Sequence, residues 1–197
     1  MDNERLLVRL IHLPVYVLGP GTRVTVWLQG CSIRCSGCMS KHTWEFDEQY
    51  VMSVNDVVNY IAPYNCSHIT ISGGEPFDQY KPLLTLLYSL KKIGVEDILI
   101  YSGYSLAHIK KHFYEALQYI DALISGKFIK GKDTNLIWKG SENQRITIFN
   151  DSVKGLYKDF TYKLKDKKLQ KLIYKNEQFI VGIPYQKDWE VVKNAFM

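Results

Sequence analysis

Three cysteines lie within one short stretch of the chain. Cys31, Cys35 and Cys38 follow the spacing CxxxCxxC, whereas the fourth cysteine, Cys66, stands alone much further on. Thiolates are soft ligands that suit iron–sulfur clusters and zinc. Three of them from one loop can hold three irons of a cubane cluster and leave the fourth iron open. Electron-carrier clusters and structural zinc sites normally close with four ligands, so the missing ligand favours a cluster that binds a further molecule.

A zinc site is the alternative interpretation of the same residues. It would combine the three clustered cysteines with His42 or Cys66 as the fourth ligand. Cys66, however, precedes an apolar run, and a lone cysteine in that position is typical of a small buried apolar side chain.

A second motif, Gly73-Gly74-Glu75-Pro76, directly follows the apolar run Ile69-Thr70-Ile71-Ser72. Two glycines let a backbone approach a ligand without obstruction by Cβ atoms. A carboxylate at the end of a strand can accept hydrogen bonds from a ligand ammonium group. Alone this pattern predicts only a turn, but together with the cysteine loop it is a specific signal of a functional site.

The elements that must position these motifs follow from the apolar spacing. Short β-branched and aromatic runs between turn residues predict strands over Arg23–Gln29, His68–Ser72, Ile98–Tyr101, Asp121–Ile124, Arg145–Phe149 and Phe179–Pro184. Helical spacing predicts helices over Ser53–Ile61, Asp78–Ile93, Ser105–Leu117 and Asp188–Phe196, with Ser53 as an N-cap and Gly94 as the end of the second helix.

Strands that alternate with helices predict βαβ units and a parallel sheet, hence an α/β fold. A complete eight-fold barrel needs about 250 residues, so the chain length of 197 favours a partial, open β/α barrel. Active-site residues of such folds gather at the C-terminal ends of the strands. The cysteine loop, the GGEP turn and the segment Ser102-Gly103-Tyr104 each follow a predicted strand and should therefore meet.

Composition divides the chain into a motif-bearing part, residues 1–150, and a basic extension, residues 151–197. The extension carries ten lysines and six acidic residues and holds most of the net charge of +5. Its lysine-rich stretch, Lys163 to Lys175, is typical of a solvated helix face or a loop. Docking of an acidic partner or nucleic acid is the other interpretation, but aromatic or arginine readers are lacking, so nucleic acid is not expected.

No window has the roughly 18 uninterrupted apolar residues that a membrane span requires, and the first residues carry acids where a signal peptide is basic. We therefore expect a cytoplasmic protein without membrane contact. A cytoplasmic setting also favours metal or redox chemistry over disulfides for the clustered cysteines.

The CxxxCxxC loop and the GGEP turn, in this order, resemble those of the radical S-adenosylmethionine (SAM) enzymes. The resemblance implies that Cys31, Cys35 and Cys38 hold one 4Fe-4S cluster, whose open iron chelates the amino and carboxylate groups of SAM. The reduced cluster then cleaves SAM into methionine and a 5′-deoxyadenosyl radical. It further implies that Gly73, Gly74 and Glu75 line the methionine moiety.

Further segments are similar to the activating proteins of anaerobic (class III) ribonucleotide reductase, from about residue 5 to 150. These segments are Gly19-Pro20-Gly21-Thr22-Arg23, Gly30-Cys31 to Cys38 with Lys41-His42-Thr43-Trp44, Tyr101 to Tyr104, Asp121 to Phe128 and Trp138 to Arg145. Glycine at position 37, where many radical SAM loops have an aromatic residue, fits this subfamily. Ser102, Tyr104 and Asn143 are candidates for the remaining SAM pocket or a channel for a partner loop; their alternative role is in turns and strand ends.

Two departures from the subfamily concern the partner. Lys139 and Glu142 replace the usual arginine and serine of a WRGSSNQ-like signature, and residues 151–197 lie outside the matched region. The resemblance implies a glycyl-radical enzyme, foremost an anaerobic ribonucleotide reductase, as the substrate, and a flavodoxin or ferredoxin as the electron donor. The alternatives are a radical SAM enzyme for another peptide or a small molecule, and a non-catalytic zinc or electron-transfer module.

Overall fold

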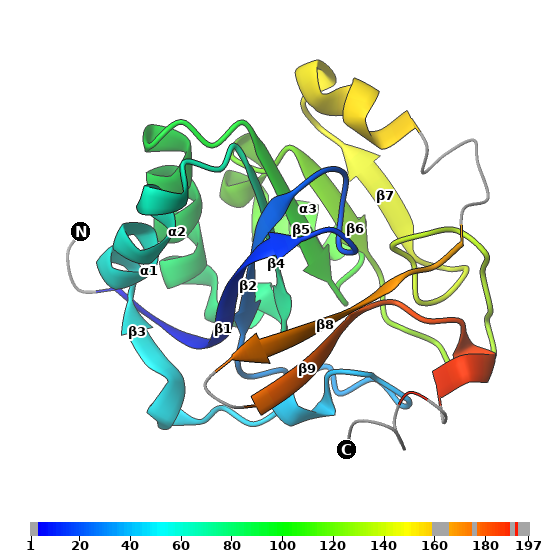
Figure 1. The fold of residues 1–197 in the computed structure, drawn as a ribbon. Helices are drawn as coiled ribbons and strands as arrows, with labels where there is room; N and C mark the ends of the chain where they lie inside the picture. Colours follow the sequence, from blue (N-terminus) through cyan, green and yellow to red (C-terminus); the bar gives the residue numbers. More distant parts are fainter. Residues whose placement is uncertain (1–3, 159–165, 175–176, 190–191, 193–197) are drawn as a thin grey trace.

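The computed structural model describes residues 4–158, 166–174, 177–189 and 192 (Figure 1). Its strands are β1 (Arg5–Val15), β2 (Arg23–Leu28), β3 (Val51–Ser53), β4 (His68–Gly73), β5 (Asp97–Ser102), β6 (Ala122–Ser125), β7 (Arg145–Ile148), β8 (Leu169–Tyr174) and β9 (Glu177–Gly182). The α-helices are α1 (Val54–Ile61), α2 (Tyr80–Lys92) and α3 (Leu106–His112). Short 3-10 helices are η1 (Lys41–Thr43), η2 (Glu48–Tyr50), η3 (Ala62–Tyr64), η4 (Pro76–Gln79), η5 (Tyr114–Gln118), η6 (Asp151–Tyr157) and η7 (Gln186–Asp188).

The described strands form one seven-stranded sheet, in the order β3-β1-β2-β4-β5-β6-β7, and the separate hairpin β8–β9. Strands β2, β4, β5 and β6 run parallel, whereas β3, β1 and β7 pair antiparallel at the two sides. The predicted α/β fold with a parallel central sheet is therefore confirmed. The carboxyl ends of its four parallel strands meet at one end of the sheet, as the motif positions require.

Alternating residues of the central strands divide the apolar core between the two faces of the sheet. Ile98 and Ile100 of β5 face the helices α1, α2 and α3, which cover one side. Leu99, between them, packs on the other side with Trp138 and Tyr157. Because strand side chains alternate with a period of two, a strand buried on both faces has an almost continuous apolar sequence.

The helices begin and end where local sequence signals predict. Ser53 caps α1 because its side chain accepts a hydrogen bond from the Asp56 N–H. Gly94, at φ +90°, follows α2 in the left-handed region that glycine adopts without strain. The helix α2 buries the leucine stripe Leu83, Leu86, Leu87 and Leu90.

Several elements differ from the expectations. The long strand β1 was not predicted because its continuous apolar run, which contains Pro14, lacks alternation. The strand β7 was predicted within a parallel pattern but is antiparallel to β6. The helix α3 ends at His112, short of Leu117, because Phe113 leaves helical geometry (φ −136°, ψ 28°) as its ring packs against Phe77 and Tyr80.

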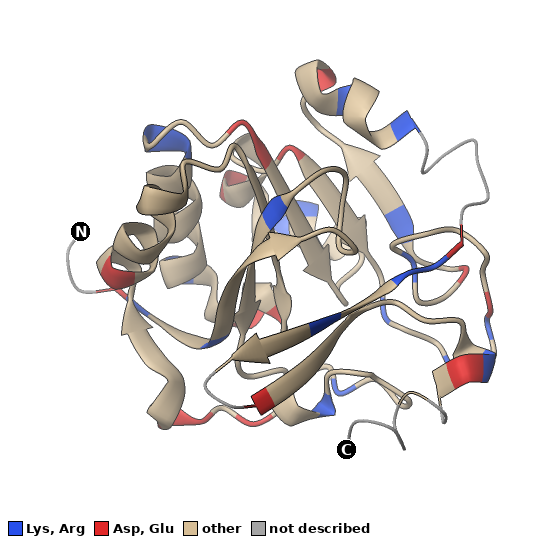
Figure 2. Ribbon diagram, in the orientation of Figure 1, with Lys and Arg blue, Asp and Glu red and all other residues tan. Residues whose placement is uncertain are grey.

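The basic extension also differs from the sequence interpretation. Of the lysine-rich stretch, residues 166–174 are described: residues 166–168 are irregular, as the loop interpretation expects, whereas Leu169–Tyr174 is the strand β8 and not a helix face. Figure 2 shows basic residues on β8 and on the segment that leads into it. The exposure of β8 alternates, with Leu172 buried and Lys171 exposed, which is the period of a half-buried strand. The predicted strand near Phe179 is β9, whereas most of the predicted helix Asp188–Phe196 lies outside the described residues.

A buried ion pair ties the extension to the central sheet. The Arg23 guanidinium donates to Asp97 Oδ2 at 2.6 Å and to Thr70 Oγ1 at 2.6 Å, and both charged side chains are fully buried. The Tyr157 hydroxyl, from η6, donates to Asp97 Oδ1 at 2.8 Å. This network links β2, β4, β5 and η6. Among the described helices, none combines the length and apolar character that crossing a lipid bilayer requires.

Candidate functional site

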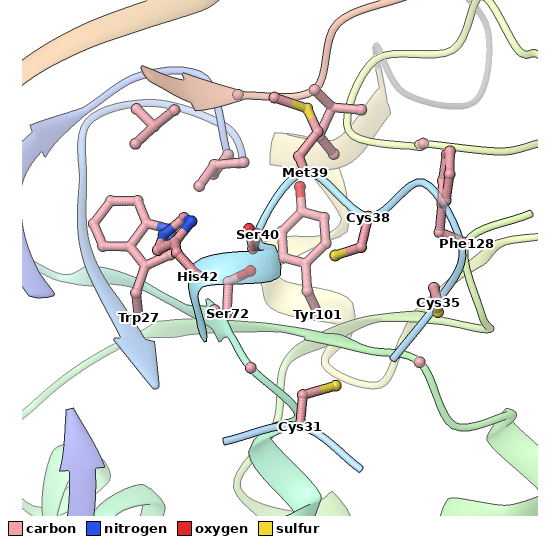
Figure 3. Close-up of a pocket in the computed structure, with 18 of the residues that line it drawn as sticks. Trp27, Cys31, Cys35, Cys38, Met39, Ser40, His42, Ser72, Tyr101 and Phe128 are labelled. Atoms are coloured by element: carbon pink, nitrogen blue, oxygen red, sulfur yellow. The ribbon is translucent and has the colours of Figure 1, made fainter. Parts of the chain in front are cut away.

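The cysteine loop leaves the carboxyl end of β2 and is fixed at both ends by backbone hydrogen bonds. The Gly30 N–H donates to the Thr43 carbonyl at 2.8 Å, and the Cys31 N–H donates to the Trp44 carbonyl at 2.9 Å. The loop therefore starts and finishes at the same place, beside the sheet. Cys31, Cys35 and Cys38 all line one cavity of about 600 Å³ at this end of the sheet (Figure 3).

The three thiols border the same cavity from different directions. In Figure 3, Cys31 lies below Cys38, and Cys35 lies to the right of both. Among the described residues, no group of three or more histidine, cysteine, aspartate or glutamate side chains is close enough to hold a metal ion. Burial raises the pKa of the Cys31 and Cys38 thiols. Because thiolates are the ligands, metal binding here must displace protons from the thiols.

Cys66 lies elsewhere and does not line the cavity. Its thiol donates to the His68 carbonyl at 3.3 Å, and its half-buried side chain packs against the apolar core. This placement agrees with its interpretation as a packing residue.

The GGEP turn is attached directly to the cysteine loop. The Gly74 N–H donates to the Leu28 carbonyl at 2.7 Å, and the Glu75 N–H donates to the Gly30 carbonyl at 2.9 Å. A Cβ atom on Gly74 would lie 2.0 Å from the Gly30 oxygen, and one on Gly73 would lie 2.4 Å from the Leu28 oxygen. The glycines thus allow a close approach to the chain's own backbone, while Gly73 and Gly74 also line the cavity.

Glu75 also lines the cavity, and its carboxylate accepts hydrogen bonds from the protein. The side chain is 1 % exposed. Its oxygens accept hydrogen bonds from the Ser102 hydroxyl at 2.8 Å, the Gly103 N–H at 2.7 Å and the Phe77 N–H at 3.1 Å. Burial raises the pKa of Glu75 to about 7. Within the protein this carboxylate joins the loops that follow β4 and β5, and its contact with a ligand ammonium stays a prediction.

The remaining predicted site residues divide into two groups. Ser102 and Gly37 line the cavity, and Gly37 adopts φ +79° opposite Phe128. Tyr104 and Asn143 do not line it. The Tyr104 hydroxyl donates to Asp78 Oδ1 at 2.8 Å, and the Asn143 amide donates to the Lys127 carbonyl at 2.8 Å.

Sequence reasoning missed a brace behind the cysteine loop. Asp78 accepts hydrogen bonds from the Ser32 N–H at 2.6 Å and the Ser32 hydroxyl at 3.0 Å, in addition to the bond from Tyr104. Ser32 directly follows the first cysteine, so this carboxylate fixes the start of the loop. Asp78 lies two residues after the GGEP turn, but no local pattern distinguishes it from a helix-start residue.

Sequence reasoning also missed one wall of the cavity. Arg9 of β1, Trp27 of β2 and the run from Glu177 to Pro184 border it. The Arg9 guanidinium donates to Glu177 Oε2 at 3.0 Å and lies over the Phe179 ring. These residues carry no motif, because their role follows from how the extension folds back over the sheet.

The residues present fit a cluster with a bound organic cofactor. The cavity combines three soft thiol donors with the close glycine backbone of the GGEP turn. The Tyr101 hydroxyl, at the cavity wall in Figure 3, is buried and has no hydrogen-bond partner among the described residues. An unsatisfied buried hydroxyl is available to a bound polar group.

Comparison with known proteins agrees with this chemistry. A family model described as a 4Fe-4S single cluster domain matches residues 17–147. The anaerobic ribonucleoside-triphosphate reductase-activating protein of Enterobacteria phage T4 is 33% identical over 144 residues, which cover 70% of this chain and 91% of that protein. The protein of the same name from Escherichia coli K12 is 31% identical, over 68% of this chain and 94% of that protein. Among solved structures, QueE from Escherichia coli is similar, with 24% identity, a TM-score of 0.44 and coverage of 51% of this chain and 53% of that chain.

The cysteine loop on the parallel sheet and the matched domain define an iron–sulfur protein with a single 4Fe-4S cluster. More narrowly, the chain belongs to the family of anaerobic ribonucleoside-triphosphate reductase-activating proteins. The resemblance found in the sequence is thereby confirmed, and the zinc interpretation is superseded by the cluster.

Proposed function

We propose that this protein is a radical SAM activase that generates a glycyl radical on an anaerobic ribonucleoside-triphosphate reductase. The observation that carries the proposal is the single cavity bordered by Cys31, Cys35, Cys38 and the GGEP turn, in a chain of the activating family. When bound, the 4Fe-4S cluster and SAM supply a 5′-deoxyadenosyl radical that abstracts hydrogen from a glycine Cα. The protein supplies positioning and excludes water.

The motif residues that line the cavity have defined roles in this proposal. The three thiolates would hold the cluster, and its remaining iron would be available to the amino and carboxylate groups of SAM. The backbone of Gly73 and Gly74 lines the methionine moiety, and Gly37 lets the loop approach the adenosyl group. Ser102, held by Glu75, keeps the loop after β5 at the wall.

Tyr104 and Asn143 act through neighbouring segments. Tyr104 braces the cysteine loop through Asp78 and Ser32. Asn143 fixes the segment after β6 by its bond to the Lys127 carbonyl. Both are therefore proposed as positioning residues for the cofactor site.

Residues 1–150 form the radical SAM domain in this proposal, with the sheet as a partial, open β/α barrel. Residues 151–197 are an extension packed on the same domain, in agreement with the contact between Tyr157 and Asp97. The reducing electron comes from a flavodoxin or a ferredoxin.

Anaerobic electron paramagnetic resonance tests the proposal. The reconstituted protein is mixed with SAM, a reductant and the anaerobic ribonucleotide reductase of the same organism. We expect a glycyl-radical doublet that disappears in Cys31→Ser, Cys35→Ser and Cys38→Ser variants. The matched control is Cys66→Ser, which changes a cysteine away from the cavity and keeps the doublet. Formation of 5′-deoxyadenosine without a doublet would retain the radical SAM chemistry and reject this partner, leaving another peptide or a small molecule as substrate.

A further inference from the structure

The hairpin β8–β9 borders the cavity with only one of its strands. Every residue of β9, from Glu177 to Gly182, lines the cavity, whereas none of β8 does. Figure 1 shows β9 on the side of β8 that is nearer to the cysteine loop. The hairpin lies beyond residue 147, where the family match ends.

Lining by consecutive residues indicates which part of β9 meets the cavity. Side chains alternate between the two faces of a strand, so a face contributes only every second residue. An unbroken run of six lining residues therefore means that the strand borders the cavity along its backbone edge. Phe179 and Val181 point to one face, where they pack on the cluster that contains Leu10 and Trp27.

Within the part of the chain that the structure describes, the edge of β9 that faces the cavity carries unpaired backbone groups. Tyr174 pairs with Glu177 across a two-residue connection, and such hairpins close on a hydrogen-bonded pair. Bonded and non-bonded pairs alternate along antiparallel strands. The backbone N–H and C=O groups of Gln178, Ile180 and Gly182 therefore point away from β8, and no described residue outside β8 bonds to them.

Contacts at both ends fix this edge in place. Glu177 is paired with Arg9 at 3.0 Å. The Gln170 side chain of β8 bonds to the Tyr16 N–H at 3.0 Å and to the Pro14 carbonyl at 2.7 Å. Beyond β9, Gln186 accepts a hydrogen bond from the Gly131 N–H at 2.7 Å. A fixed edge loses little conformational entropy when it binds a partner.

We propose that the free edge of β9 is a binding site for an extended polypeptide main chain, which adds to the hairpin as a third strand. This inference rests on the proposed function, and its occupant is the glycine-bearing segment of the reductase. Glycine offers no side chain, so the segment must be recognised through its backbone, and strand addition does this by main-chain hydrogen bonds. A strand added here lies about 4.8 Å from β9, inside the cavity that the three cysteines border.

Two proline variants test the edge. Ile180 and Lys171 face each other in the hairpin register, and their N–H groups point to opposite edges. Ile180→Pro removes a donor from the cavity edge, whereas Lys171→Pro removes the equivalent donor from the outer edge of β8. For the reconstituted protein, we expect Ile180→Pro to raise the reductase concentration for half-maximal glycyl-radical formation at least tenfold. Lys171→Pro should leave this concentration unchanged, and equal values for both variants and the unchanged protein overturn the inference.

Amide hydrogen exchange provides a readout that does not depend on activity or on the variants. The probe is the reductase itself, added to the reconstituted protein with SAM. We expect slower exchange at Gln178, Ile180 and Gly182, and unchanged exchange at Lys171 and Ile173 on the outer edge. If both proline variants unfold the hairpin, this measurement decides: no protection at the three β9 amides overturns the inference. If the unsubstituted protein itself yields no glycyl radical, that result overturns the proposed function and not this inference.

Discussion

At the scale of single residues, Gly74 is the point where the two motifs touch. Its N–H bonds to Leu28, and the space for a Cβ atom is taken by the Gly30 carbonyl at 2.0 Å. Since that obstacle is backbone, it moves only if the start of the cysteine loop moves. The requirement for glycine thus belongs to the assembly of the loop as much as to ligand contact.

Gly74→Ala should therefore destabilise the protein and impair cluster loading. Overpacking against fixed atoms costs about 1–3 kcal/mol of unfolding free energy. Gly155→Ala is the matched control, because no atom lies within 4 Å of its Cβ position. Urea unfolding and iron content after reconstitution measure the two effects. Equal stability and iron content in both variants would show that the turn shifts freely.

Glu75 makes the stability of the fold depend on pH. Burial raises the pKa of this carboxyl from 4.5 to about 7. Between these values the native state holds a proton that the unfolded chain has released. The contribution of Glu75 to stability is then greatest below about pH 4.5 and decreases as the pH rises to about 7, by about 3 kcal/mol for a shift of this size.

Glu75→Gln should remove this pH dependence, because the amide does not titrate. Anaerobic urea unfolding at pH 5 and pH 7.5 measures the difference for both proteins. If the unfolding free energy of the variant still decreases between pH 5 and pH 7.5, another titrating group causes the pH dependence.

At the scale of elements, the buried Arg23–Asp97 pair determines how the extension is attached. Removing one member of a buried pair leaves an uncompensated charge, and Asp97→Ala should cost about 3–5 kcal/mol of unfolding free energy. Tyr157→Phe removes only the hydrogen bond from η6 and should cost about 1–2 kcal/mol. Asp151→Ala, at the exposed start of η6, is the control and should change stability by less than about 0.5 kcal/mol. Thermal or urea unfolding ranks the three variants, and an equal cost for Asp97→Ala and the control would contradict the role of the pair.

The sequence predicts the elements whose signals are local. Strands β2, β4, β5 and β6 read as apolar runs between turns, and Ser53 and Gly94 delimit helices by their own chemistry. The antiparallel direction of β7 depends on its pairing with β6, and β8 depends on the packing of Leu172 against Leu10 and Trp27, which come from the start of the chain. Local patterns carry no information about those partners.

The candidate site divides in the same way. The cysteines and the GGEP turn are contiguous motifs, so the spacing of their residues indicates their chemistry. Arg9, Asp78 and the wall formed by β9 come from segments far apart in the chain. Their contributions depend on the fold and could not be predicted before the topology was known.

At the scale of the whole molecule, the cluster and the sheet should respond differently to air. The cysteines border an open cavity, so oxygen has access to a cluster with an incompletely ligated iron. The sheet is held by a separate apolar core between β5 and the helices. Exposure to air should remove iron and sulfide and abolish SAM cleavage, while the far-ultraviolet circular dichroism stays unchanged. A preparation that keeps full iron and sulfide in air would contradict this expectation.

The two outermost strands of the seven-stranded sheet are short, since β3 has three residues and β7 has four. Short outer strands expose few free backbone groups, and this limits stacking of one molecule onto another into aggregates. The six-residue edge of β9 is longer but borders the cavity, between the hairpin and the cysteine loop. The seven-stranded sheet thus offers another copy of itself little edge to pair with, which favours solubility at high concentration, and the longer edges belong to the separate hairpin β8–β9.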